Sequence, residues 1–323
     1  MNRRMNLLLI VILSLSFSLS SCSIQSNMMS DNMLTIDLIV KMNQGDYWNT
    51  LKSGAEAAAK EFNVKLHFLA PNHEDDIPGQ IELVNQSIQN RPDAIILAAS
   101  DYMGLAQATD RIAYENIPII SIDSEVGSAR VKTYVGTNNY EAGQLAAKRM
   151  IELIHESGQI AVMNFVEAAK NANQREEGFQ DYVARFPNVR VVDIQYSQSN
   201  QRNAEEITRR WLAQYPSLDG IVALNAESSI GVGREVQRSG HGGSVKVIAF
   251  DSPPETMGLL QDGVVQGLVL QNPFNNGYLA VKYAVDIIEG RNVPERIDTG
   301  VKLIDLDNML WPENQKLLFP FVK

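Results

Sequence analysis

The stretch IISIDS at Ile119–Ser124 decides the fold, because a matching stretch, VIAFDS, stands at Val247–Ser252. Each is a short apolar run that ends in Asp-Ser, which is typical of a buried strand in a parallel sheet. A second matching pair precedes them, PDAIIL at 92–97 and LDGIVA at 218–223. The paired runs indicate that one α/β unit occurs twice in the chain.

Short apolar runs alternate with amphipathic helical stretches around these paired segments. We expect strands near residues 35–40, 64–69, 94–98, 118–122, 159–163, 190–195, 220–224 and 245–250. Helices are expected between them, near residues 47–62, 79–90, 102–115, 173–185, 202–215 and 228–239. Strands that alternate with helices form parallel sheets covered on both faces. The fold class predicted is therefore α/β, with two Rossmann-like lobes.

Asp123 and Asp251 stand at the carboxyl ends of two corresponding strands in the predicted repeat. Open α/β sheets bind their ligands outside the carboxyl ends of the strands. In two lobes that face each other, these strand ends point into one shared cleft. We therefore expect the two aspartates on opposite walls of that cleft.

The N-terminal residues carry the features of an export signal. A basic start precedes the apolar run Leu7–Leu19, so residues 1–21 are predicted to be a signal peptide. The end of this segment, Leu19–Cys22 (LSSC), resembles the lipobox of bacterial lipoproteins, which implies cleavage before Cys22 and a lipid on its thiol. Residues 22–33 are polar and lack periodicity, as a flexible tether does. We expect an extracytoplasmic protein that is lipid-anchored to the cell membrane.

The composition argues against several classes of protein. The 28 basic and 38 acidic residues give a formal net charge of −10, which disfavours nucleic acid as a partner. The four histidines are scattered without the spacing of metal ligands. The first predicted strand is followed by KMNQG at Lys41–Gly45, which lacks the glycine fingerprint of a dinucleotide site. We expect neither a cofactor nor a metal.

Several segments together resemble the type I periplasmic sugar-binding proteins, the ribose- and galactose-binding group. They are Ile119–Asp123, Gln174–Phe179, Val247–Asp251 and Gly267–Tyr278, and the resemblance extends over nearly all of residues 34–305. It implies two lobes joined by a three-crossover hinge, which close on a monosaccharide or a similar polyol. It also implies delivery of the ligand to an ABC permease, or presentation to a membrane sensor, by a protein expected to be a monomer.

The resemblance makes each lobe discontinuous in sequence. It implies that the first lobe comprises residues 34–137 with 272–300, and the second lobe residues 138–271 with 301–323.

The resemblance also implies which side chains contact the ligand. Sugar hydroxyls donate and accept at once, which suits planar side chains with two polar atoms. Carboxylates would accept from hydroxyls, a guanidinium and two amides would donate to oxygens, and aromatic rings would cover the apolar face of the sugar. The expected contacts are Lys41, Tyr47, Trp48, Asp123, Asn139, Arg175, Asn225, Asp251 and Gln271.

Alternatives remain open at several of these positions. Lys41 either contacts the ligand or neutralises Asp101 or Asp46. Trp48 also fits the apolar stripe of the first helix, and Arg175 has adjacent glutamates, Glu176 and Glu177, with which to pair at the surface.

Two departures from the family pattern concern the identity of the sugar. Ribose binders carry an amide where this chain has Ala98 and an acid where it has Ala226, which puts ribose in doubt.

Two functions from other classes compete with ligand binding. A pair of aspartates across a cleft is compatible with a glycoside-acting enzyme. However, neither aspartate has an apolar sequence environment that would raise its pKa, so we expect no enzyme activity. A sugar-responsive repressor needs a helix-turn-helix before the first strand, where this chain has its predicted leader and tether.

Overall fold

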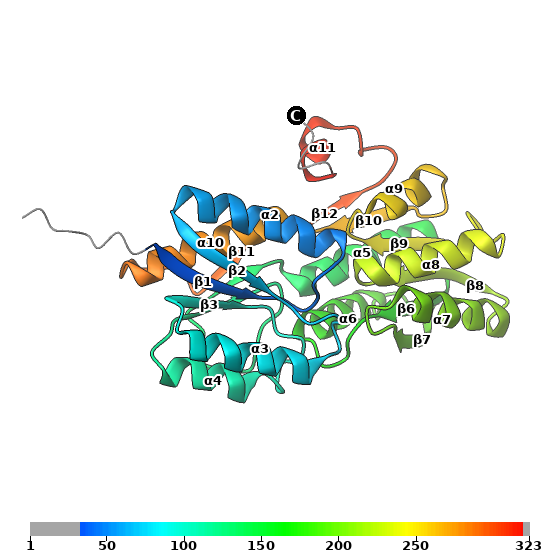
Figure 1. Ribbon diagram of the computed structural model, residues 1–323. Coiled ribbons are helices and arrows are strands. Elements are labelled where there is room, and N and C mark those ends of the chain that lie inside the picture. The colour runs from blue at the N-terminus through cyan, green and yellow to red at the C-terminus, as the bar shows by residue number, and fades with distance from the viewer. Residues whose placement is uncertain (1–32, 319–323) are drawn as a thin grey trace, which may run out of the picture. The chain divides into compact units, whose positions relative to one another are not determined.

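Six parallel strands form the first sheet, in the order β11-β5-β4-β3-β1-β2 (Figure 1). The strands are β1 (Leu34–Ile39), β2 (Val64–Leu69), β3 (Ala94–Leu97), β4 (Ile119–Ile122), β5 (Thr133–Gly136) and β11 (Arg296–Asp298). One face packs against α2 (Asp46–Glu61) and α10 (Pro273–Ile288). The other face packs against α3 (Ile77–Asn90) and α4 (Ala106–Tyr114). We call this sheet and its helices the first lobe.

The second sheet has the order β12-β10-β9-β8-β6-β7, and only β12 runs antiparallel to its neighbour. Its strands are β6 (Gly158–Asn164), β7 (Val189–Tyr196), β8 (Leu218–Ala223), β9 (Lys246–Phe250), β10 (Gly267–Leu270) and β12 (Lys302–Ile304). One face packs against α5 (Asn139–Leu153) and α6 (Lys170–Val183). The other packs against α7 (Gln201–Gln214), α8 (Ala226–Arg238) and α9 (Pro254–Gln261). We call this the second lobe.

The strand order confirms the internal repeat. The strands of the first matching pair, β3 and β8, occupy the same place in their sheets, and so do β4 and β9 of the second pair. All the strands and helices expected from the sequence are present, and the largest shift of a boundary is at the start of α4. Helix α4 begins at Ala106 rather than near residue 102, because the Asp101 carboxylate accepts from the amides of Met103 and Gly104 and closes a turn first.

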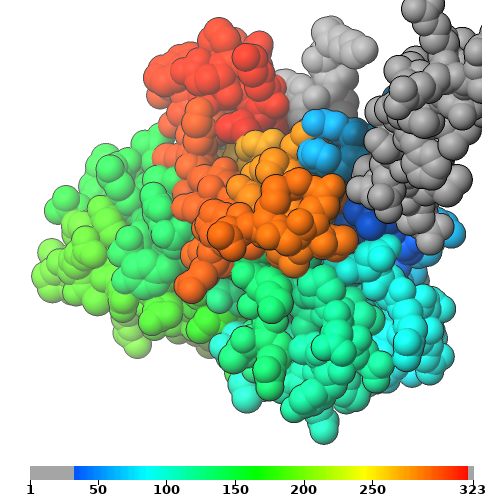
Figure 2. Space-filling model, turned by 90° about the vertical axis from the view of Figure 1, so that its left-hand side faces the viewer, coloured from blue at the N-terminus to red at the C-terminus, as the bar shows by residue number. Residues whose placement is uncertain are grey.

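The chain passes between the two sheets three times, after β5, after β10 and after β11. Beyond β12 the chain reaches a last helix, α11 (Pro312–Leu318), whose Leu318 is buried in the core of the second lobe. Figure 2 shows this C-terminal segment, in red, at the surface next to the orange part of the chain.

The computed structural model describes residues 33–318. The predicted signal peptide, Cys22 and nearly all of the predicted tether lie outside these residues. Within them, no helix combines the length and the hydropathy that crossing a membrane requires.

Candidate functional site

Asp123 and Asp251 share an unusual backbone conformation. Their φ angles are 61° and 62°, in the left-handed region that few residues other than glycine adopt. Each amide is held in the same way, donating at 3.0 Å to the carbonyl of Val135 and of Val269 respectively. Both residues follow the last residue of a central strand, β4 or β9, and both are buried. Backbone strain of this kind gathers at ligand sites, and here it occurs twice at equivalent positions.

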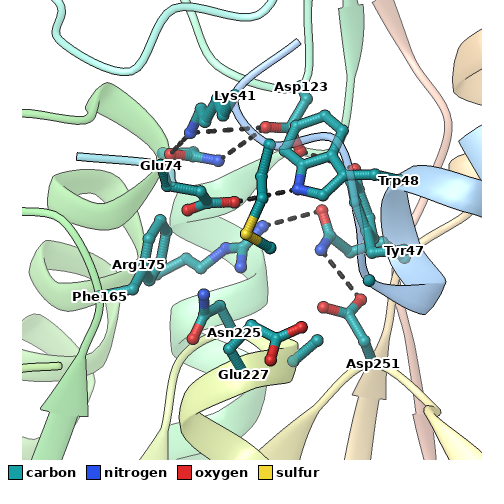
Figure 3. Close-up of a pocket in the computed structure, with 15 residues that line it drawn as sticks. Lys41, Tyr47, Trp48, Glu74, Asp123, Phe165, Arg175, Asn225, Glu227 and Asp251 are labelled. Atoms are coloured by element: carbon teal, nitrogen blue, oxygen red, sulfur yellow. Dashed lines mark hydrogen bonds and ion pairs between the residues drawn. The ribbon is translucent and has the colours of Figure 1, made fainter. Parts of the chain in front are cut away.

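Both aspartates line one cavity (Figure 3). Its walls come from both lobes. The lining residues are Lys41, Met42, Gly45, Tyr47, Trp48, Glu74, Asp123, Phe165, Asn171, Arg175, Asn225, Ala226, Glu227, Asp251 and Gln271. The sequence-predicted contact residues are therefore brought together, with the exception of Asn139.

The Asp123 carboxylate is held on both of its oxygens. Tyr47 donates its hydroxyl to Oδ1 at 2.6 Å, and Asn171 donates its amide to Oδ2 at 3.1 Å. The Lys41 ammonium, only 1% exposed, lies 3.6 Å from Oδ2 and donates to Asn171 Oδ1 at 3.0 Å. Lys41 thus pairs with Asp123, and neither alternative partner, Asp101 or Asp46, takes that place. Because Asn171 belongs to α6, this cluster joins the two lobes.

Burial raises the pKa of Tyr47 well above its usual value, and the nearby carboxylates of Asp123 and Asp251 raise it further. Tyr47 therefore stays a neutral donor to Asp123.

Arg175 is buried in the second lobe, 1% exposed, and does not pair with the neighbouring glutamates of its helix. Its Nε donates to Asn139 Oδ1 at 2.9 Å, its Nη1 to the Leu224 carbonyl at 2.6 Å, and its Nη2 to Gln271 Oε1 at 2.8 Å. Its guanidinium lies 4.7 Å from the ring centroid of Phe250. Asn139 therefore lies behind Arg175, which it helps to orient, and not in the cavity wall.

Close packing of α5 on α6 fixes the position of Arg175. A Cβ at Gly143 would lie 2.0 Å from the carbonyl oxygen of Arg175, and one at Gly178 would lie 2.0 Å from that of Tyr140. Only glycine allows the two helix backbones to approach so closely. The glycine that follows Arg175 in the REEGF segment therefore sets the distance between the two helices.

The Asp251 carboxylate is less fully satisfied than that of Asp123. Its Oδ1 accepts from Gln271 Nε2 at 3.0 Å, and no other described side chain or amide donates to it. Burial raises the pKa of Asp251 to about 6, although the Arg175 charge and the Gln271 hydrogen bond oppose the shift. The expectation from the sequence that neither aspartate has a raised pKa is therefore wrong for Asp251. Its second oxygen is available to a ligand in the cavity (Figure 3).

A second polar cluster joins the lobes near Trp48. Trp48 Nε1 donates to Glu74 Oε1 at 3.1 Å, and Ser199 donates to Glu74 Oε2 at 2.5 Å. Asn225 Nδ2 donates to Ser199 Oγ at 2.9 Å, while its Oδ1 caps α8 by accepting from the Ser228 amide. Trp48 thus packs in the core of the first lobe and also lines the cavity. Asn225 is a helix cap whose amide faces the cavity.

Several wall residues were not predicted from the sequence, namely Met42, Gly45, Glu74, Phe165, Asn171, Ala226 as a lining position, and Glu227. Asn171 had a usable signal, because it stands four residues before Arg175 and so lies on the same face of the helix. Glu74 had none, since it lies in a turn rich in polar residues, whereas Glu227 stands in the first turn of α8, two residues after Asn225. Burial raises the pKa of Glu227, with opposition from its hydrogen bond to Gln201.

Comparisons with known proteins agree with this geometry. The family described as periplasmic binding protein domain matches residues 36–292. The ribose import binding protein RbsB of Bacillus subtilis is 26% identical over 91% of this chain and 97% of its own length. A carbohydrate transporter solute-binding protein of Agrobacterium radiobacter, solved with D-arabinose, has a TM-score of 0.87 and 30% identity, covering 90% of this chain and 100% of that one.

A sugar transporter structure from Clostridium phytofermentans has a TM-score of 0.79 and 34% identity, covering 84% of this chain and 99% of that one. These relatives are named as binding and transport proteins, not as enzymes.

Proposed function

We propose that this chain, which belongs to the type I periplasmic binding proteins and to their group of sugar-binding proteins that serve ABC transporters, captures a monosaccharide or similar polyol between its lobes. We also propose that it is a lipid-anchored lipoprotein. The observation that carries the proposal is the pair of equivalent aspartates, both with a left-handed backbone, facing one cavity. The carboxylates, the Arg175 guanidinium and the amides of Asn225 and Gln271 offer the planar groups that bind sugar hydroxyls well.

The ligand class follows from the wall and from the relatives together. The relatives named above are a ribose import binding protein and a protein solved with D-arabinose, both of which concern monosaccharides. In this chain Ala98 and Ala226 replace polar residues that the resemblance places in ribose binders, so we propose a monosaccharide other than ribose.

The test of this proposal is a thermal-shift screen of pentoses, hexoses, the polyols formed by reducing these sugars, and inositols. Each hit is then measured by calorimetric titration. We expect at least one of them to raise the melting temperature and to bind with one-to-one stoichiometry. If the whole panel leaves the melting temperature unchanged, the sugar-binding proposal is wrong.

We propose that residues 34–137 with 272–300 move as one lobe and residues 138–271 with 301–323 as the other. Ligand that bridges the cavity favours the closed arrangement of such lobes. Small-angle scattering should then show compaction when the ligand found by the screen is added. An unchanged radius of gyration at saturation would contradict the hinge.

Lipid attachment at Cys22 completes the proposal, and it rests on the LSSC segment at Leu19–Cys22. Cys22→Ser should release the protein from the membrane fraction or leave it unprocessed. A substituted protein that is still cleaved and still sediments with membranes would refute the lipid anchor.

A further inference from the structure

We infer that the ligand is an amino sugar, whose ammonium group is bound by Glu227 and Asp251; this inference rests on the proposed sugar-binding function. Its basis is the balance of charge in the cavity wall and the position of the carboxylate oxygens that lack a donor.

The cavity wall holds more negative than positive charge. Its cations are Lys41 and Arg175, and its carboxylates are Glu74, Asp123, Glu227 and Asp251. When all six are ionised, the wall therefore carries two uncompensated negative charges. Charges enclosed between two lobes are costly unless they are paired, because little water remains to screen them.

The two cations are already committed. Lys41 pairs with Asp123 at 3.6 Å and donates to Asn171. Arg175 donates to three neutral oxygens, and its charge acts on Asp251 without a direct hydrogen bond between them. Arg234, the cation that acts on Glu227 from outside the wall, is itself bound by two other glutamates. A positive charge to match Glu227 must therefore come from elsewhere.

Glu227 and Asp251 each present an oxygen without a donor among the described residues. Glu227 Oε2 accepts from Gln201 at 2.6 Å, which leaves Oε1. Asp251, only 8% exposed, accepts from Gln271 on Oδ1, which leaves Oδ2. Glu74 differs, because both of its oxygens accept hydrogen bonds, from Trp48 and Ser199. The free acceptors thus belong to two carboxylates that line the same cavity (Figure 3).

Glu227 of the second lobe lies against the first lobe. Its Oε1 lies 3.0 Å from where a Cβ at Gly45 would stand, and Gly45 has a φ of 98°. A side chain at this position would be strained and would crowd the carboxylate. Glycine therefore leaves Oε1 accessible at the point where the lobes meet.

Neutral hydroxyls would donate to these oxygens but would leave the negative charge in place. The electrostatic cost appears in the pKa values of Glu227 and Asp251, both raised by burial and by neighbouring carboxylates. An ammonium group supplies three donors and one positive charge, so it satisfies the oxygens and offsets the charge together.

The experiment is calorimetric titration of the full chain at pH 7 with three matched sets of sugars. The first set is glucosamine, galactosamine and mannosamine, and the second is the parent sugars glucose, galactose and mannose. The third set is the N-acetyl derivatives, in which the nitrogen belongs to an uncharged amide. We expect at least one amino sugar to bind about tenfold or more tighter than its parent and its N-acetyl form, as an added charge-assisted bond provides. Glu227→Gln should reduce this ratio, whereas Glu206→Gln, an exposed acid of the same lobe, should keep it.

The possible outcomes distinguish a failure of the amino-sugar inference from a failure of the proposed sugar-binding function. If parent or N-acetyl sugars bind as tightly as the amino sugars, the amino-sugar inference is wrong and sugar binding stands. If no sugar of any set or of the wider panel binds, the proposed function fails and the inference with it. A melting curve of Glu227→Gln checks its fold, and the wild-type comparison decides the question even where that variant is unstable.

Discussion

The two aspartates of the cavity have the same backbone but different chemical surroundings. Asp123 and Asp251 match in φ angle, in strand position and in the carbonyl that receives the amide. The Asp123 carboxylate is nevertheless bound by Tyr47, Asn171 and Lys41, whereas that of Asp251 has only Gln271. The repeat therefore duplicated a geometry, while the side chains around it diverged.

This difference assigns the two residues different roles. Asp123 anchors a cluster that spans both lobes, because its partner Asn171 lies on α6 of the second lobe. Asp251 has one oxygen open to the cavity and a raised pKa of about 6, as expected of an acceptor that lacks a donor until a ligand binds. The sequence suggested equal ligand contact for both, and the structure distinguishes them.

The largest expected effect on stability comes from replacing Arg175, the cation near Asp251. Arg175→Met should lower the free energy of unfolding by about 3–5 kcal/mol, because it leaves Asp251 without its nearby cation and orphans three buried acceptors. Denaturant unfolding measures the effect. Arg190→Met, at an exposed arginine of the same lobe, is the control and should change stability by less than about 0.5 kcal/mol. Equal small losses in both variants would show that Arg175 does not hold the site.

The pH dependence of stability should come next in size. The folded pKa of Asp251, about 6, lies above the usual value of 3.8, so its ionised form is disfavoured in the folded protein. The resulting destabilisation, up to about 3 kcal/mol, is present above pH 6 and disappears as the pH falls toward 4. Asp251→Asn should therefore make the ligand-free protein more stable at pH 7, with a gain that shrinks toward pH 4.

Denaturant unfolding of both proteins from pH 4 to pH 8 measures this gain. Asp307→Asn, at an exposed position of the C-terminal segment, is the matched control. A gain that is constant with pH would mean that the charge on Asp251 is not its cause.

A smaller effect is expected on the Asp123 side. Asn171→Ala removes the amide that links Asp123 and Lys41 across the lobes, at a cost of about 1–2 kcal/mol in ligand affinity, or roughly five- to thirtyfold. Titration of the ligand into this variant and into Asn188→Ala, an exposed asparagine of the same lobe, makes the comparison. Unchanged ligand affinity in Asn171→Ala would contradict the proposal that this cluster anchors the two lobes.

Most of the fold could be predicted from the sequence because the repeat is visible in apolar runs such as those at 119–124 and 247–252. Strands β5, β10, β11 and β12 were not assigned, and two of them, β11 and β12, have only three residues each, too few to show a pattern. Among site residues, the strand-end aspartates were predicted because topology places them, and the amides because the family resemblance implies them. Glu74 was missed because it lies in a polar turn that no sequence pattern distinguishes.

The central claim is that Asp251 is the open acceptor for a sugar in the shared cavity. Calorimetric titration of the best sugar from the screen into wild type and Asp251→Ala tests it most directly. The loss should be about 2–4 kcal/mol, or roughly thirty- to a thousandfold in Kd, because the sugar hydroxyl or amine then lacks its buried partner. The ligand-free melting temperature should not fall. Near wild-type affinity in Asp251→Ala would contradict the account.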